Sequence, residues 1–170
     1  YKGLSIKLLE KISENTKIKF VPKFYPWVRA LKMIEEGDVD IVLSLKKTPE
    51  RENFMTFSPE PVFPNPMSVF YNSSNKFEYK EWLSLKKFKD GVSLGDKFGD
   101  GFDEFLGKEL NVDIAPTMEE NFIKLQNQRI DYFITGRYVG LYYIKETHLE
   151  SEIKVQDLDV NKGFIYFGYS

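Results

Sequence analysis

Arg51 is the side chain of this sequence whose position most clearly suggests chemistry. It ends the turn Thr48-Pro49-Glu50-Arg51, which follows a run of apolar residues. Thr48 is a good helix N-cap and Pro49 a good first helical residue, so a short helix is expected to begin here. A positive charge in the first turn opposes the helix dipole, so the partner of Arg51 is either a neighbouring glutamate or a bound anion. Because a guanidinium binds a carboxylate through two parallel hydrogen bonds, a small organic acid would suit this position.

The other reactive side chains complete no known type of site. Asp96, Asp100 and Glu104 are spaced like part of a calcium loop, but Phe98 and Gly107 stand where two further ligands are required. The chain has no cysteine and a single histidine, which excludes thiolate metal sites, iron–sulfur clusters, cysteine nucleophiles and disulfides. We therefore expect no catalytic residue, no metal and no cofactor, and a protein that is not an enzyme.

Composition narrows the class of protein further. The 170 residues carry 24 Lys+Arg against 26 Asp+Glu, and 42% of them are hydrophobic. This is too apolar for a disordered chain and too evenly charged for a dedicated nucleic-acid binder. No apolar stretch is long enough to span a membrane, and the first residues do not form a signal pattern. We expect a folded, soluble α/β protein without nucleic-acid partner or direct membrane insertion.

Two similar units supply the elements that would position Arg51. In the first, a helix is expected from residue 4, a short strand near 18–22, a helix opened by Pro26, and a buried strand over 39–43. Strand, helix and strand would form a right-handed crossover unit.

The second unit repeats this pattern. A strand over 112–115 is followed by a capping box of Thr117 and Glu120, a helix, and a strand over 130–134. An aliphatic–aspartate pair opens the buried strand in both units, Val39-Asp40 and Ile130-Asp131. Two α/β lobes are therefore expected, each a mainly parallel sheet flanked by helices.

Four of the eight prolines fall within residues 58–66, which separate the two units. Such a segment forms neither a helix nor a central strand. Extended apolar segments follow it and close the chain, and we expect them to cross between the lobes. The expected division is lobe 1 over 1–66 and 167–170, crossing strands over 67–72 and 162–166, and lobe 2 over 73–161. The default ligand site is the cleft between the lobes.

Several segments of both units resemble the extracellular solute-binding proteins of family 3, which are polar amino-acid receptors of ABC importers. In the first unit these segments are 26–31, 36–41, 48–51 and 54–59, and in the second they are 85–95, 102–106 and 128–131. The resemblance covers nearly the whole chain. It implies a type II periplasmic binding protein, in which two α/β lobes close around one small ligand.

The resemblance also implies which residues contact the ligand. Arg51 matches the arginine that holds the ligand carboxylate. Trp27 stands where the family has a large wall of the cleft, although its spacing also fits core packing. The remaining expected contacts are Ser44 and Lys46 in lobe 1, and Lys97 and Phe98 in lobe 2.

One departure from the family pattern concerns the ligand. The acid that pairs with an α-ammonium group in the family should follow Asp131 by about five positions, but Thr135-Gly136-Arg137 contains none. With Lys46, Lys97 and Arg137 expected near the cleft, a more anionic or a non-amino solute is favoured.

The expected function is therefore capture of a small polar or anionic solute, an amino acid or a related carboxylate, for the membrane permease of an ABC importer. A ligand-sensing extracellular domain of a kinase or cyclase receptor is the alternative, and a lyase or lytic enzyme on the same fold is a weaker one. The protein would be periplasmic or extracellular, lipid-anchored or secreted, with its signal segment outside this chain. Compared with the family, the chain is expected to lack an N-terminal strand and a C-terminal segment of lobe 1.

Overall fold

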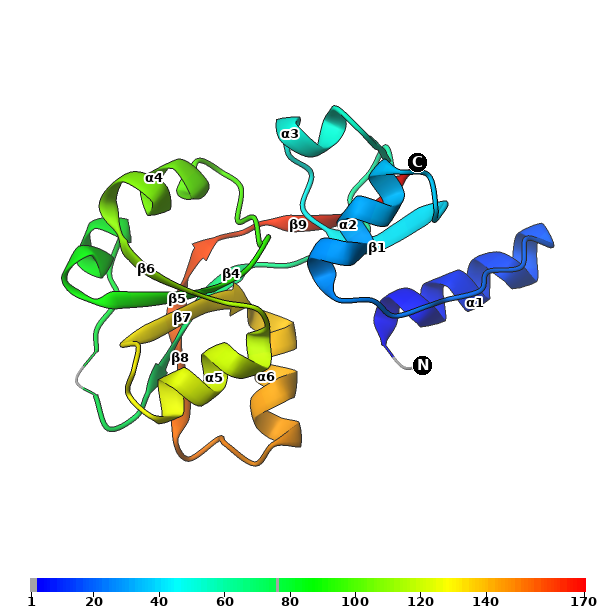
Figure 1. The fold of residues 1–170 in the computed structure, drawn as a ribbon. Coiled ribbons are helices and arrows are strands. Elements are labelled where there is room, and N and C mark those ends of the chain that lie inside the picture. The colour runs from blue at the N-terminus through cyan, green and yellow to red at the C-terminus, as the bar shows by residue number, and fades with distance from the viewer. Residues whose placement is uncertain (1–2, 76) are drawn as a thin grey trace.

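The computed structural model describes residues 3–75 and 77–170 and has two α/β lobes joined by two chain crossings (Figure 1). The expected two-lobe α/β fold is thus confirmed. The N-terminal region and the C-terminal strand form lobe 1, and the middle of the chain forms lobe 2 (Figure 1).

In lobe 1, a small sheet is built around the last strand of the chain. The helices of this lobe are α1 (Leu4–Thr16), α2 (Trp27–Glu35) and α3 (Pro49–Glu52), and the strands are β1 (Ile41–Leu45), β2 (Thr56–Phe57), β3 (Phe63–Pro64) and β9 (Phe164–Tyr169). Strands β1, β2 and β3 all pair antiparallel with β9. The mainly parallel sheet expected for this lobe is therefore wrong, because its central strand comes from the end of the chain and runs the opposite way.

A five-stranded mixed sheet forms the centre of lobe 2, in the order β6-β5-β7-β4-β8. Its elements are β4 (Met67–Asn72), the 3-10 helix η1 (Trp82–Lys87), β5 (Lys89–Ser93), α4 (Phe102–Glu109), β6 (Asn111–Ala115), α5 (Met118–Gln126), β7 (Tyr132–Gly136), α6 (Arg137–Glu146) and β8 (Ile153–Asn161). Strands β6, β5 and β7 are parallel, whereas β4 pairs antiparallel with both β7 and β8.

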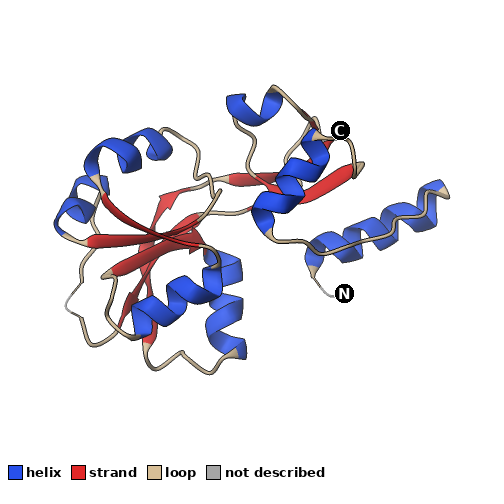
Figure 2. Ribbon diagram, viewed as in Figure 1, coloured by secondary structure: helices blue, strands red, loops and turns tan. Residues whose placement is uncertain are grey.

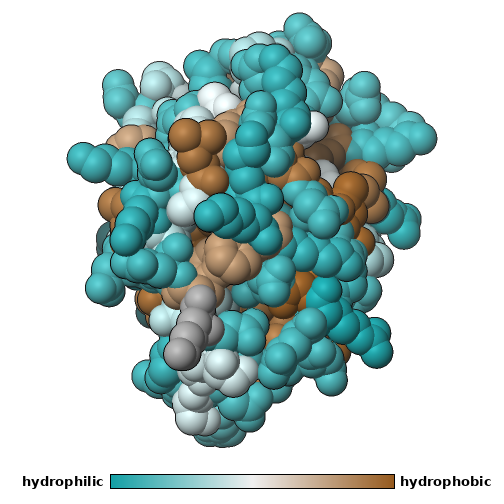
Figure 3. Space-filling view, turned by 90° about the vertical axis from the view of Figure 1, so that its left-hand side faces the viewer, coloured by the Kyte–Doolittle hydropathy of each residue, from teal (hydrophilic) through white to brown (hydrophobic). Residues whose placement is uncertain are grey.

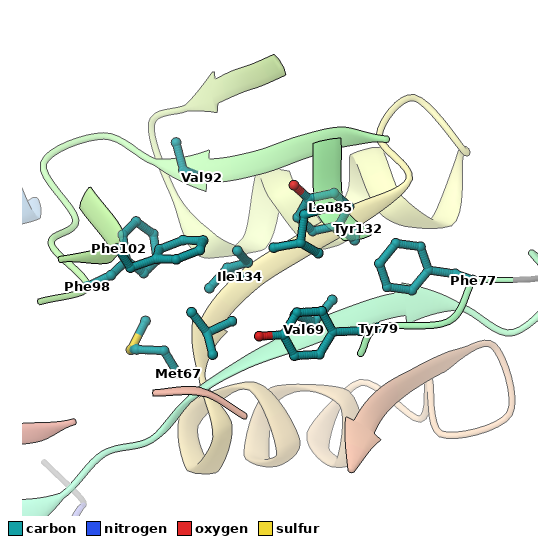
Figure 4. Close-up of a cluster of buried hydrophobic side chains, with 11 residues drawn as sticks. Met67, Val69, Phe77, Tyr79, Leu85, Val92, Phe98, Phe102, Tyr132 and Ile134 are labelled. Carbon is teal, nitrogen blue, oxygen red and sulfur yellow. The ribbon is translucent and has the colours of Figure 1, made fainter. Parts of the chain in front are cut away.

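Helices cover both faces of this sheet (Figure 2), and a hydrophobic cluster lies on each face. Tyr132 and Phe133 are neighbours on β7 and contribute to different core clusters, because successive strand side chains point to opposite faces. One cluster packs the sheet against η1 and α4 (Figure 4). The other packs it against α5 and α6. The outer end of lobe 2, away from lobe 1, is largely hydrophilic with isolated hydrophobic groups (Figure 3).

Most of the expected elements form. Pro26 precedes α2, and the Thr117 side chain accepts a hydrogen bond from the Glu120 amide at the start of α5. The strand expected over 18–22 is wrong, because this segment has no strand pairing. An apolar groove of about 820 Å³ separates residues 18–25 from β1, so the segment is not placed to hydrogen-bond with it.

The two extended segments that we expected to cross between the lobes are strands of one lobe each. β4 pairs along its length within lobe 2, and β9 pairs within lobe 1. The crossings themselves are short, and the Asn65 amide of one donates to the Gly163 carbonyl of the other at 2.8 Å. No helix in the described part of the chain is long and apolar enough to span a membrane.

Candidate functional site

The two lobes meet where α2 and α3 of lobe 1 face the turn between β5 and α4 of lobe 2. The contacts are concentrated on Gly95 and Lys97 of that turn. Both belong to the loop that follows the carboxyl end of a parallel strand, where ligands of α/β sheets commonly bind. This interface is therefore the candidate ligand site.

Arg51 lies at the centre of the interface, 4% exposed. Its amide donates to the Thr48 side chain, so the predicted N-cap is confirmed and fixes the start of α3. The guanidinium donates through Nη1 to the Lys46 carbonyl at 2.9 Å and through Nη2 to the Gly95 carbonyl at 3.1 Å. Burial lowers the pKa of Arg51, and the nearby charge of Asp96 opposes this most strongly. A guanidinium always stays protonated in proteins, so the site carries a buried positive charge.

Trp27 forms a wall beside Arg51. The guanidinium carbon lies 5.5 Å from the centroid of the Trp27 ring, within range of a cation–π interaction. The indole Nε1 donates to the Gly95 carbonyl at 3.1 Å. Trp27 also packs against the core of lobe 1. The Trp27 side chain therefore contacts both the core of lobe 1 and the Gly95 turn of lobe 2.

The backbone conformation of Gly95 allows Trp27 and Arg51 of lobe 1 to approach its carbonyl closely. Its φ is +78°, and a Cβ atom there would lie 3.3 Å from both Trp27 Cδ1 and Val28 Cγ2. Glycine adopts this φ without a steric penalty and lets the lobes approach. A carbonyl oxygen of lobe 2 can therefore reach two donors of lobe 1.

A salt bridge joins the lobes beside this contact. Lys97 Nζ lies 2.9 Å from Glu50 Oε2, with side chains 36% and 68% exposed. The hydrogen bond and positive charge of Lys97 lower the pKa of Glu50. Lys97 thus lies at the interface as expected, but its charge is paired with an acid of lobe 1.

Lys46 lies at the chain crossings. Its Nζ donates to the Asn65 carbonyl at 3.0 Å. A Cβ on Gly163 would come within 1.8 Å of this nitrogen, so the glycine leaves room for it. Burial lowers the pKa of Lys46 to about 8, and Asp100 and Asp103 offset part of this effect.

Ser44 and Phe98 are not brought to the interface. The Ser44 hydroxyl lies 2.7 Å from that of Ser5, on the side of β1 that faces α1. Phe98 is 2% exposed and packs against Phe102 in the core of lobe 2 (Figure 4). Its turn is held instead by Asp103, which accepts hydrogen bonds from the amides of Phe98 and Gly99.

Arg137 also lies away from the site. Its guanidinium pairs with Asp159 at 2.8 Å and donates to the carbonyls of Gln156 and Asp157. It therefore ties the start of α6 to β8 within lobe 2. The cluster of Lys46, Lys97 and Arg137 that the sequence suggested does not form.

Asp96 is the site residue that sequence reasoning missed. It follows Gly95, is half-buried, and interacts electrostatically with Arg51. Burial raises the pKa of Asp96 to about 6, although Arg51 and a hydrogen bond with Ser93 act in the opposite direction. The position of this acid directly after Gly95 could have revealed it, but the sequence suggested only a failed calcium loop. Among residues 3–75 and 77–170, no group of three or more His, Cys, Asp or Glu side chains could hold a metal ion.

The groups at this interface suit the binding of a small polar molecule. The interface offers one buried guanidinium, an aromatic ring, main-chain groups of the Gly95 turn, and a carboxylate. These are the groups with which proteins hold small charged ligands between two lobes.

Sequence comparison gives a family for the first part of the chain. The sequence model of the bacterial extracellular solute-binding proteins, family 3, matches residues 1–106. No curated protein sequence matches the chain.

Solved structures with the same fold include three binding proteins. An ancestral arginine-binding protein bound to arginine has a TM-score of 0.80 at 22% identity, over 96% of this chain and 72% of its own. Holo ArgBP from T. maritima has a TM-score of 0.83 at 14% identity, over 98% of this chain and 72% of its own. The GluR0 ligand-binding core from Nostoc punctiforme, in complex with L-glutamate, has a TM-score of 0.79 at 17% identity, over 97% of this chain and 75% of its own. At these identities the likeness concerns the fold alone.

Proposed function

Because this chain belongs to the bacterial extracellular solute-binding proteins of family 3, we propose that it captures a small polar solute outside the cytoplasm for the membrane permease of an ABC importer. The solute is an amino acid or a related carboxylate. The observation that carries this proposal is the buried guanidinium of Arg51 at the contact between the lobes.

In the proposed complex, a carboxylate of the solute replaces the Gly95 carbonyl as the partner of Arg51. Charge-assisted hydrogen bonds to a carboxylate are stronger than those to a neutral carbonyl, so the exchange is favourable. Trp27 then covers an apolar part of the solute, and the Gly95 turn of lobe 2 closes over it. A micromolar dissociation constant requires about 8 kcal/mol, which one charged pair, one aromatic wall and several amide hydrogen bonds can supply.

The fold shared with the glutamate-bound GluR0 core supports a second candidate, the ligand-sensing domain of a receptor. Both functions begin with the same binding step and differ in the protein that reads the closed state. Uptake of a labelled solute by cells with and without the gene would separate them, because a pure sensor leaves uptake unchanged.

The binding step is tested by identifying the solute. Mass spectrometry of the purified protein should find a co-purified amino acid or carboxylate. Calorimetry against the standard amino acids and succinate should then give one preferred ligand.

Arg51→Ala should lower the affinity for that ligand by at least about 30-fold, because loss of a buried charged partner typically costs 2 kcal/mol or more. Arg129→Ala is a matched control, since Arg129 is exposed in lobe 2. Unchanged affinity in Arg51→Ala would refute the site, and turnover of a bound solute would refute the binding-protein function.

A further inference from the structure

We propose that Asp96 sets the charge of the solute, so that the site accepts a ligand with one carboxylate and disfavours one that carries a second negative charge. This inference rests on the proposed function and assigns a specificity-determining residue to it. It also reverses the expectation of a more anionic solute that the sequence suggested.

Asp96 stands beside the group that would hold the ligand carboxylate. It is the residue after Gly95, whose carbonyl accepts from both Arg51 and Trp27. Among the acids whose charge acts on Arg51, Asp96 has the largest electrostatic effect. A carboxylate that binds Arg51 therefore enters next to an acid of the protein.

The surroundings of Asp96 offer little to offset a further negative charge. Asp96 and Asp103 line the same cavity of about 510 Å³ beneath the turn. Arg51 is the positive charge that acts on Asp96, and Asp103 adds a second negative one. Burial weakens solvent screening, so a second ligand carboxylate placed close to Asp96 would be repelled by both Asp96 and Asp103.

The lysines near the site are already engaged. Lys97 pairs with Glu50 across the interface. Lys46 donates to the Asn65 carbonyl and faces the charges of Asp100 and Asp103. A second anionic group would have to break one of these arrangements, whereas a neutral or cationic group would not.

Isosteric pairs of amino acids test this directly. L-glutamine and L-glutamate, like L-asparagine and L-aspartate, have nearly the same shape and differ by one charge. Calorimetry at about pH 7.5 should show that the wild-type protein binds the neutral member at least about tenfold more tightly, because like charges placed together cost more than the 1.4 kcal/mol that corresponds to tenfold.

Asp96→Asn keeps the shape of the side chain and removes its charge, so it should reduce this preference by about tenfold. Asp157→Asn is the matched control, since Asp157 is an exposed residue of β8 in the same lobe and should leave the preference unchanged. Lowering the pH from about 7.5 to about 5 should weaken the preference of the wild type and not of Asp96→Asn, because the pKa of Asp96 lies near 6.

Each outcome decides between the two proposals. Binding with the same neutral-to-anionic ratio in wild type and Asp96→Asn overturns the role of Asp96 and leaves the proposed function intact. A wild-type preference for the anionic member also overturns it. If no standard amino acid or succinate binds to either protein, the proposed function itself fails, and the inference about Asp96 fails with it.

Discussion

The guanidinium of Arg51 lies over the ring of Trp27, 5.5 Å from its centroid, and both side chains donate to one carbonyl oxygen of the opposite lobe. That oxygen belongs to Gly95. The two lobes are thus joined through the residues proposed to hold the solute, so ligand binding and lobe closure involve the same contacts. Four predictions follow from this arrangement and from the interior of lobe 2.

A side chain at position 95 should disturb the interface. Gly95→Ala places a Cβ 3.3 Å from Trp27 and Val28 at a φ of +78°. Gly99→Ala is a matched control, because Gly99 has a φ of +80° and nothing within 4 Å of a Cβ. Both variants should lose about 1 to 2 kcal/mol of stability from the backbone conformation. Only Gly95→Ala should change Trp27 fluorescence in a Trp82→Phe background, and equal spectra for both variants would contradict the contact.

The Glu50–Lys97 salt bridge should make a small, salt-sensitive contribution to closure. Exposed pairs of this kind contribute about 0.2 to 1 kcal/mol. Glu50→Lys should shift the Trp27 emission of the unliganded protein toward that of an open form, because it places two positive charges together. The double exchange Glu50→Lys with Lys97→Glu should restore the emission. A difference in Trp27 emission between Glu50→Lys and the wild type that persists in about 1 M salt would argue against an electrostatic cause.

Asp90 should make the protein less stable as the pH rises. Neither of its carboxylate oxygens has a hydrogen-bond partner in the described structure, and the residue is fully buried. Burial raises the pKa of Asp90 well above its usual value of 3.8. The stabilising contribution of the protonated form is therefore complete below about pH 4 and is lost as the pH rises through the folded-state pKa.

Asp90→Asn should remove this loss of stability with rising pH. It should also raise the free energy of unfolding at pH 7 by more than about 1 kcal/mol. Urea denaturation across the pH range measures it. Asp113→Asn should instead lower the free energy of unfolding at pH 7. Lys124 and Lys89 lower the pKa of Asp113, so the ionised carboxylate stabilises the fold and this contribution is lost as the pH falls. That surface effect should stay below about 1 kcal/mol. A parallel pH dependence for wild type and Asp90→Asn would show that Asp90 is not the cause.

The hydroxyl of Tyr132 should be dispensable. It is buried without a hydrogen-bond partner in the described part of the chain, and burial raises the pKa of Tyr132, which keeps the hydroxyl protonated. Tyr132→Phe should leave the free energy of unfolding unchanged or raise it by about 1 kcal/mol, because an unsatisfied polar group is removed. Tyr132→Ala should cost about 3 to 5 kcal/mol, since it also removes the packed ring. A marked loss in Tyr132→Phe would reveal a partner for the hydroxyl.

Local sequence signals predicted the helices α1, α2, α3 and α5 and the strands β1, β6 and β7, but not β5 or β8. Thr117 caps α5 and Pro26 precedes α2 as expected, because capping depends on residues a few positions apart. The segment 18–22 is apolar enough for a strand but forms none. A strand needs a neighbour at hydrogen-bonding distance, and the composition of the segment does not show whether one is present.

The site was only partly predictable for the same reason. Arg51 could be identified because its helix start, charge and surroundings are encoded within a few residues. The sequence indicated a ligand contact for Phe98, but an aromatic residue in a turn suits either a cleft or a core, and Phe98 packs against Phe102 in the core of lobe 2. The charges of Lys97 and Arg137 are likewise paired with Glu50 and Asp159, which lie far from them in the sequence.

The sequence by itself determined the α/β class, the two-lobe organisation, and the arginine at the start of a short helix. These depend on periodicity, capping and local charge, which act over a few residues. Only the tertiary structure decided which groups meet that arginine: the Gly95 carbonyl, the Trp27 ring and the carboxylate of Asp96. Which charges offset one another between lobes depends on distance in space, and that distance is set by how the chain crosses from one lobe to the other.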